Sequence, residues 1–207
     1  MANSKHILRI KEKVHNCMVK IQKFVETPSQ TAGPFLHIGC TPSITGINIF
    51  KDELGSTPFK NISLNEEINI KGKIYDGNND PIIDAMIETW QCDKNGKYFN
   101  YQGFSRRVTD FKTGEYQLKT IRPGNQIKED GKISPSYILF WIVARGMNRP
   151  LITRMYFDEN ELKRDVVFQS LNIQDRFKTL IPLTEDKKNF VFDIHLHGKK
   201  ETIFFEF

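Results

Sequence analysis

Two histidines near the C-terminus are the most direct candidates for metal chemistry in this sequence. His195 and His197 are two residues apart, and on a strand such residues face the same side, so both imidazoles could bind one metal ion. Apolar residues alternate with them at positions 190, 192, 194 and 196. If those residues face the core, both histidines point outward, and no Cys, Asp or Glu at ligand spacing completes a set. We therefore favour surface histidines over a metal site.

A guanidinium at the end of the longest apolar run is the second candidate. Arg145 follows the apolar residues 137–144, which predict a central strand that is buried on both faces. An arginine buried there needs an anion. The anion could be a carboxylate of this chain or the carboxylate of a bound ligand, which the planar guanidinium suits. The residue types leave both possibilities open.

Other polar residues give weaker signals. His37 lies in a segment rich in Pro and Gly and is predicted to be a hydrogen-bonded structural residue. Tyr98 and Tyr101, with Arg106 and Arg107, are predicted to form a polar aromatic cluster at a solvated strand edge. The sequence has no G-x-S-x-G, phosphate-binding loop or H-E-x-x-H motif, so the corresponding hydrolase and nucleotide-binding functions lose support.

Composition indicates a folded chain. Of 207 residues, 39% are hydrophobic and 27% are charged, which excludes a disordered or collagen-like protein. No apolar run reaches the roughly 18 residues of a membrane helix. Three cysteines, Cys17, Cys40 and Cys92, have no C-x-x-C spacing. An odd count of this kind disfavours a disulfide scaffold or a structural zinc site, and it favours the reducing cytoplasm.

The basic charge is confined to a leader. Residues 1–24 contain six Lys or Arg and one Glu, which accounts for the whole net charge of +5. Because residues 25–207 are neutral overall, we expect no nucleic-acid partner. Apolar residues of the leader recur at helical spacing from Ile7 to Ile21. The leader could be a membrane-surface helix, a transit peptide, an ordinary packing helix or a tail, or translation could start at Met18.

The remaining residues, 25–207, are predicted to form a single all-β domain, a β-sandwich with one short helix and long loops. Prolines and glycines in residues 26–43 predict an extended loop. Asn95-Gly96 is a hairpin signal, residues 108–121 are expected to form a hairpin, and residues 160–171 a helix. Short apolar or alternating runs predict the strands. They lie at residues 68–74, 82–91, 108–110, 115–121, 137–145, 153–157, 190–196 and 202–207.

Several motifs, in order over about residues 20–207, resemble the alpha chains of the protocatechuate 3,4-dioxygenases, a family of intradiol ring-cleavage enzymes. The most specific motifs are residues 27–35 with His37-Ile38-Gly39, and residues 201–207. Further matches are Gly72 to Gly77, Glu88 to Gln91, Asn95 to Tyr98, Thr120 to Gly124, Ala144 to Gly146 and Thr153 to Asp158.

The resemblance implies a β-sandwich and cleavage of protocatechuate by O₂ to 3-carboxy-cis,cis-muconate, in aromatic catabolism. In this family a non-haem Fe³⁺ is held by two tyrosines and two histidines. Tyr98 matches the first tyrosine. The second is expected just after Arg122-Pro123-Gly124, where Asn125-Gln126 offer no phenol, and Tyr137 and Leu139 occupy the two histidine positions. The resemblance therefore implies a chain that binds no metal, is inactive alone, and works with an iron-bearing beta subunit in a hetero-oligomer.

The resemblance also implies the residues that line the substrate pocket. Thr31 and Gly33 match the loop that approaches the partner's iron, and Arg145 matches an arginine that faces the substrate, here read as the partner of the ring carboxylate. Phe35 stands where the family commonly has tyrosine. Two alternatives stay open: a stand-alone, non-catalytic β-sandwich that binds a ligand or a protein, and a metalloenzyme that uses His195 and His197.

Overall fold

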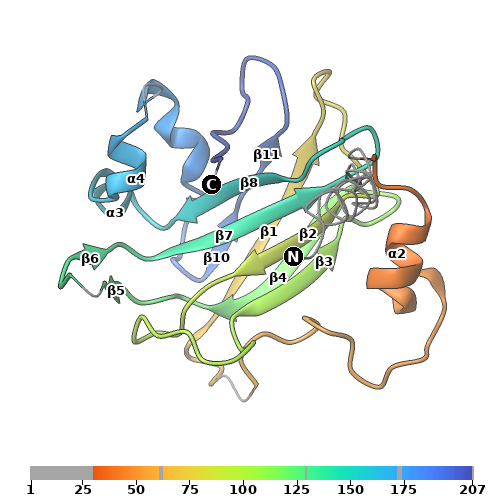
Figure 1. Cartoon of the computed structure of the whole chain (residues 1–207), viewed down its shortest axis with the longest axis horizontal. Helices are drawn as coiled ribbons and strands as arrows, with labels where there is room; N and C mark the ends of the chain where they lie inside the picture. The colour runs from red at the N-terminus through yellow and green to blue at the C-terminus, as the bar shows by residue number, and fades with distance from the viewer. Residues whose placement is uncertain (1–29, 61–62, 129, 172–173, 207) are drawn as a thin grey trace, which may run out of the picture.

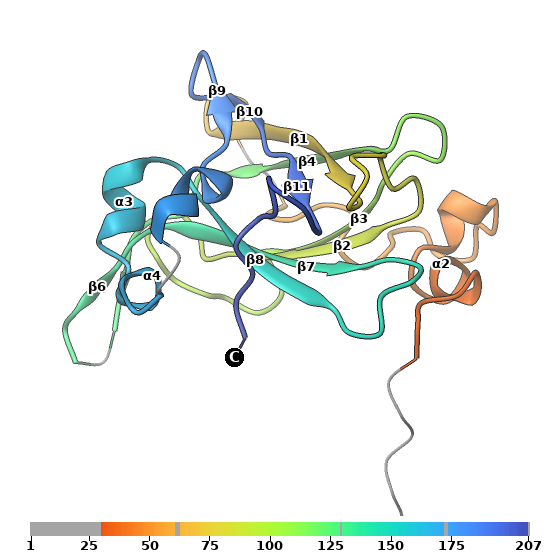
Figure 2. The same cartoon turned by 90° about the horizontal axis from the view of Figure 1, so that it is seen from above.

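Two facing sheets form the body of the protein (Figures 1 and 2). The computed structural model describes residues 30–60, 63–128, 130–171 and 174–206, so the predicted leader and Cys17 lie outside the described residues. In the first sheet, β1 (Glu67–Tyr75) pairs antiparallel with β4 (Glu115–Ile121) and parallel with β10 (Asn189–Val191) and β11 (Ile194–His195), and β9 (Leu183–Thr184) lies beyond β10.

The second sheet has the order β3 (Phe104–Val108), β2 (Met86–Trp90), β7 (Tyr137–Val143) and β8 (Leu151–Tyr156), all antiparallel. A small hairpin, β5 (Gln126–Ile127) with β6 (Ile133–Ser134), extends beyond it. The predicted all-β sandwich is confirmed. No helix in the part of the chain that the structure describes has the length and apolar character needed to cross a membrane.

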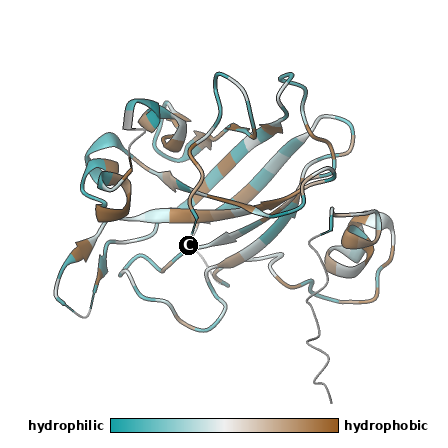
Figure 3. Cartoon of the chain, turned by 45° about the horizontal axis from the view of Figure 1, so that its top comes forward, coloured by the Kyte–Doolittle hydropathy of each residue, from teal (hydrophilic) through white to brown (hydrophobic). Residues whose placement is uncertain are grey.

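The core lies between the two sheets and follows from alternation along the strands, which Figure 3 shows as bands of brown and teal. Its apolar residues are buried, and rings from opposite sheets meet there: Phe140 of β7 lies 5.1 Å from Phe192. Gly72 permits this packing, because a Cβ there would lie 2.0 Å from the Phe192 carbonyl oxygen. The main members are Ile68, Ile70, Ile74, Leu118, Ile138, Phe140, Ile142, Phe190, Phe192 and Ile194.

The strand β7 is central in its sheet, but the prediction that both of its faces are buried was wrong. Ile138, Phe140 and Ile142 are buried, whereas the residues between them are only half-buried. An apolar run indicates non-polar surroundings, but it does not tell whether this chain alone covers both faces of the strand.

Two turns were predicted correctly, but only one of them joins strands that pair with each other. The Asp110 carboxylate accepts hydrogen bonds from the backbone N–H groups of Lys112 and Thr113, yet this turn joins β3 to β4, which belong to different sheets. Asp93 similarly caps the turn at Asn95-Gly96. This turn lies within the long connection between β2 and β3, which pair antiparallel, so the hairpin signal is confirmed there. Turn chemistry reverses the chain without determining which strands pair.

The N-terminal loop contains a helix that the sequence did not predict. Helix α2 (Phe35–Cys40) starts directly after Pro34, and the 3-10 helix η1 (Pro42–Thr45) starts at a proline. Proline is tolerated at a helix start, where no backbone N–H donor is needed. The six residues of α2 fit between the two prolines.

The predicted helix over residues 160–171 is split into α3 (Glu159–Lys163) and α4 (Val166–Gln169), followed by the 3-10 helix η2 (Gln174–Leu180). Asp165 breaks it, because its carboxylate turns inward and also caps α4. Residues 202–206 are extended but form no ladder strand: the N–H of Phe205 donates to the carbonyl of Ile152, while Thr202 bonds His195.

Candidate functional site

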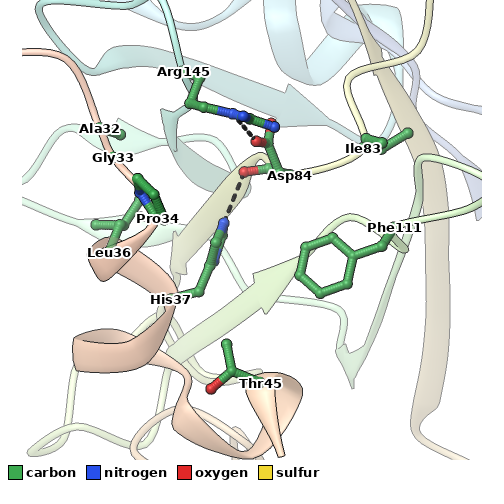
Figure 4. A pocket seen from close by; sticks show the side chains of 10 residues that line it. All are labelled: Ala32, Gly33, Pro34, Leu36, His37, Thr45, Ile83, Asp84, Phe111 and Arg145. Carbon is green, nitrogen blue, oxygen red and sulfur yellow. Dashed lines mark hydrogen bonds and ion pairs between the residues drawn. The ribbon is translucent and has the colours of Figure 1, made fainter.

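A pocket of about 270 Å³ lies at one end of the sandwich, beside α2 (Figure 4). Its walls come from segments far apart in the sequence: the loop and first turns around α2, the residues before β2, the Asp110 turn, and the turn that follows β7. The lining is mainly apolar, with one charged pair and one histidine. It comprises Ala32, Gly33, Pro34, Leu36, His37, Thr45, Ile83, Asp84, Phe111 and Arg145.

Arg145 lies at the rim of this pocket and is paired with Asp84. Its Nε donates to the Asp84 carboxylate. The prediction that Arg145 is buried was wrong: its side chain is 67% exposed, whereas that of Asp84 is 14% exposed. The strand β7 ends at Val143, so the guanidinium extends past the sheet. Of the two anions that the sequence allowed, the structure supplies the carboxylate of this chain.

The rim is connected by two further hydrogen bonds. The N–H of Gly146 donates to Thr31 Oγ1 at 2.7 Å, which joins the loop before α2 to the turn that carries Arg145. His37 Nε2 lies 3.1 Å from the backbone oxygen of Asp84, and its ring is edge-on to Phe111 at 5.8 Å. His37 is buried, and its predicted role as a hydrogen-bonded structural residue is confirmed.

The structure brings together some of the predicted site residues. Gly33 and Arg145 line the pocket, and Thr31 bonds the residue next to Arg145. Phe35 does not line it: this first residue of α2 is 80% exposed. Asp84 and Phe111 were not predicted, because the requirement for an anion near Arg145 does not identify which carboxylate supplies it.

The positions that the motif resemblance predicts for the iron ligands also come together, at the other end of β7. Gln126 Nε2 donates to the Tyr98 hydroxyl at 3.2 Å, and the Tyr98 ring stacks on Trp90 with 5.6 Å between centroids. Leu139 lies opposite Trp90 in the register of β2 and β7. The N–H of Gly124 donates to the carbonyl of Asp93. This hydrogen bond holds the segment after β4 against the connection between β2 and β3.

These residues do not fit an iron ion. Leu139 offers no donor atom, and the Tyr98 hydroxyl accepts a hydrogen bond from Gln126. Partial burial and the neighbouring Tyr137 raise the pKa of the Tyr98 phenol. Over the described ranges, no group of three His, Cys, Asp or Glu is placed to hold a metal.

The C-terminal histidines do not form a site either. His195 stacks on Tyr75 with 4.7 Å between ring centroids. His197 is 82% exposed, and its Nδ1 lies 3.1 Å from the Glu201 carboxylate.

The predicted aromatic and arginine cluster is also dispersed. Arg106 pairs with Glu88 at 2.6 Å and donates to the carbonyl of Cys40. Arg107 instead donates to the carbonyls of Gly55 and Ser56. Both arginines therefore hold the N-terminal segments against the sheet, while Tyr98 belongs to the Gln126 cluster.

Comparison with known proteins identifies the family. A family model described as Dioxygenase matches residues 51–198. This chain belongs to the intradiol dioxygenases. It is 36% identical over 200 residues to the protocatechuate 3,4-dioxygenase alpha chain of Pseudomonas putida, covering 90% of this chain and 99% of that one. The beta chain of Burkholderia cepacia is 27% identical over 160 residues, 67% of this chain and 68% of that one. The resemblance predicted from the motifs is confirmed.

Solved structures of intradiol dioxygenases share the fold. Hydroxyquinol 1,2-dioxygenase from Pseudomonas putida superposes with a TM-score of 0.54 at 16% identity, covering 93% of this chain and 75% of that one. At this identity the likeness concerns the architecture of the sandwich. The structural likeness therefore covers nearly the whole of this chain.

Proposed function

We propose that this chain is the alpha subunit of a protocatechuate 3,4-dioxygenase. With an iron-bearing beta subunit it would cleave 3,4-dihydroxybenzoate with O₂ to 3-carboxy-cis,cis-muconate. The observation that carries the proposal is the Tyr98 cluster, where Gln126, Tyr137 and Leu139 stand at or beside the places that the resemblance gives to the other three iron ligands. A family member without its own iron set requires the iron of another chain, and the alpha-chain relative matches this chain along nearly its whole length.

In this proposal the pocket beside α2 is part of the substrate site, which the beta subunit completes. The Arg145 terminal nitrogens bind the ring carboxylate, because a guanidinium offers two parallel donors to a planar anion. The apolar walls, with Phe111 among them, contact the ring. Gly33 faces open space, since a Cβ at this position would have no atom within 4 Å. A partner or a substrate can therefore approach the backbone closely.

Thr31 and Phe35 have different roles. Thr31 holds the loop against Gly146 and so fixes the distance between Gly33 and Arg145. Phe35, exposed and directly after Pro34, is proposed to contact the beta subunit or the substrate at the shared boundary. Fe³⁺ is assigned to the beta subunit, and this chain supplies binding and orientation. The cysteines Cys40 and Cys92 are both free, which supports the cytoplasm as the location.

Co-expression with an intradiol dioxygenase beta chain from the same genome tests the proposal. We expect a complex that contains iron and consumes O₂ with 3,4-dihydroxybenzoate, whereas this chain purified alone contains no stoichiometric iron and no activity. Iron and turnover in the chain alone would overturn the assignment. A stable monomer that binds no beta chain would instead support a stand-alone binding protein.

A further inference from the structure

Asp84 occupies a central position at the rim of the pocket. Its carboxylate accepts from Arg145 Nε, while its backbone oxygen accepts from His37, so it holds the arginine and α2 at once (Figure 4). The side chain is mostly buried. Within the described part of the chain, its carboxylate has no other hydrogen-bond partner than Arg145.

The pairing leaves one edge of the guanidinium available. Asp84 binds Nε, and the terminal nitrogens of Arg145 have no partner among the residues that the structure describes. A ligand carboxylate bound at those nitrogens would therefore sit across the guanidinium from a second carboxylate. The ligand carboxylate and the Asp84 carboxylate would then lie a few ångströms apart, well inside the Debye length of about 8 Å at physiological ionic strength. The two carboxylates would therefore repel each other, although the guanidinium between them attracts both.

We propose that Asp84 is a specificity-determining residue that limits the preference of this pocket for carboxylated over uncarboxylated catechols. This inference rests on the proposed function. Asp84 orients the guanidinium through Nε and at the same time neutralises its charge, so the rim presents a positioned hydrogen-bond donor pair with no net charge. A carboxylated ring then gains hydrogen bonds but only part of the attraction that an unpaired arginine would give it. A ring without a carboxylate gains neither these hydrogen bonds nor this attraction, so the charge of Asp84 does not change how tightly it binds.

The variant Asp84→Asn separates the two effects. Its amide oxygen can still accept from Arg145 Nε, and the His37 bond is made to the backbone, so the position of the guanidinium is kept while the charge is lost. We expect KM and the anaerobic dissociation constant for 3,4-dihydroxybenzoate to fall about two- to fivefold, the range for one exposed charge pair. Both constants for catechol, which has no carboxylate, should change much less. The gain should shrink as salt is raised.

Two further variants serve as comparisons in the same alpha–beta complex. Glu185→Gln removes the same charge from an exposed turn whose residues do not line the pocket, and it should change nothing. Arg145→Met should weaken the binding of 3,4-dihydroxybenzoate at least tenfold, because a charged hydrogen bond is lost, and it should leave the binding of catechol nearly unchanged.

The outcomes are distinguishable. If Arg145→Met affects both rings equally, or neither, the carboxylate assignment in the proposed function fails. If Arg145→Met acts selectively but Asp84→Asn leaves 3,4-dihydroxybenzoate binding unchanged or weaker, the role proposed for Asp84 is wrong. Should the Asn variant fail to assemble, Asp84→Ser removes the same charge with a shorter side chain, and it should also tighten binding of 3,4-dihydroxybenzoate relative to catechol.

Discussion

Asp165 anchors a buried charge network, and its removal should destabilise the chain strongly. Its side chain is 3% exposed and that of Arg154 is 8% exposed. The carboxylate accepts from Arg154 Nη1 at 2.9 Å, from the Tyr156 hydroxyl at 2.7 Å and from the N–H of Val167, where it caps α4. The guanidinium also lies 4.3 Å from the ring centroid of Tyr137. Asp165→Ala removes the carboxylate and leaves the guanidinium buried.

Breaking a buried ion pair on one side costs about 3–5 kcal/mol, and loss of the cap adds to this. For a domain of this size, about 1 kcal/mol lowers Tm by roughly 2–4 °C. We therefore expect Asp165→Ala to lower Tm by about 6–20 °C. Removing both charges, in Arg154→Met with Asp165→Ala, should restore part of the loss, because no uncompensated buried cation remains.

Scanning calorimetry or circular dichroism on the purified chain measures the effect. Asp52→Ala is the matched control, since Asp52 is exposed and should tolerate the same change. A decrease in Tm of less than about 3 °C for Asp165→Ala would show that the network contributes little. A double variant less stable than the single variant would show that packing, and not the unpaired charge, dominates.

Three further changes have defined outcomes. Gly33→Ala should leave Tm unchanged, as a Cβ there meets no atom within 4 Å, but raise KM for 3,4-dihydroxybenzoate severalfold in the complex; an unchanged KM would remove Gly33 from the site. Burial and Lys200 lower the pKa of His195, so stability should fall as pH drops below about 6.5. His195→Phe should flatten that dependence of Tm on pH. Combining Gln126→Tyr, Tyr137→His and Leu139→His beside Tyr98 should give stoichiometric iron and a visible phenolate-to-iron band; colourless, iron-free protein would contradict it.

Much of the sandwich could be predicted from the sequence because its strands are specified locally. Alternation places Ile68, Ile70 and Ile74 on one face of β1 and Phe190, Phe192 and Ile194 on one face of the C-terminal strands, and all six are buried. The sequence was less informative about which strands pair with each other. Asp110 and Gly114 specify a turn, but whether the following strand joins the same sheet or the opposite one depends on packing that the turn residues do not encode.

The site was predictable only as far as single residues carry a signal. The motif residues Gly33 and Arg145 line one pocket, and their role in binding substrate stays a prediction. Asp84 was not found, because the ion pair joins positions 61 residues apart and nothing in the residues around Asp84 marks it. Asp165 broke a predicted helix for the same kind of reason, since its partner Arg154 lies on a different element.

The long sequence separations at the rim of the pocket have a consequence for how the pocket forms. Thr31 and Gly146 are 115 residues apart, Asp84 and Arg145 are 61 apart, and His37 and Asp84 are 47 apart. Closing such long loops costs entropy before the contacts stabilise anything, so contacts of this kind form late in folding. These hydrogen bonds, together with the one from Arg106 to the carbonyl of Cys40, hold the α2 segment against the sandwich. Local opening of the rim should therefore precede global unfolding, and a binding surface shared with another chain would become fully ordered only when that chain arrives.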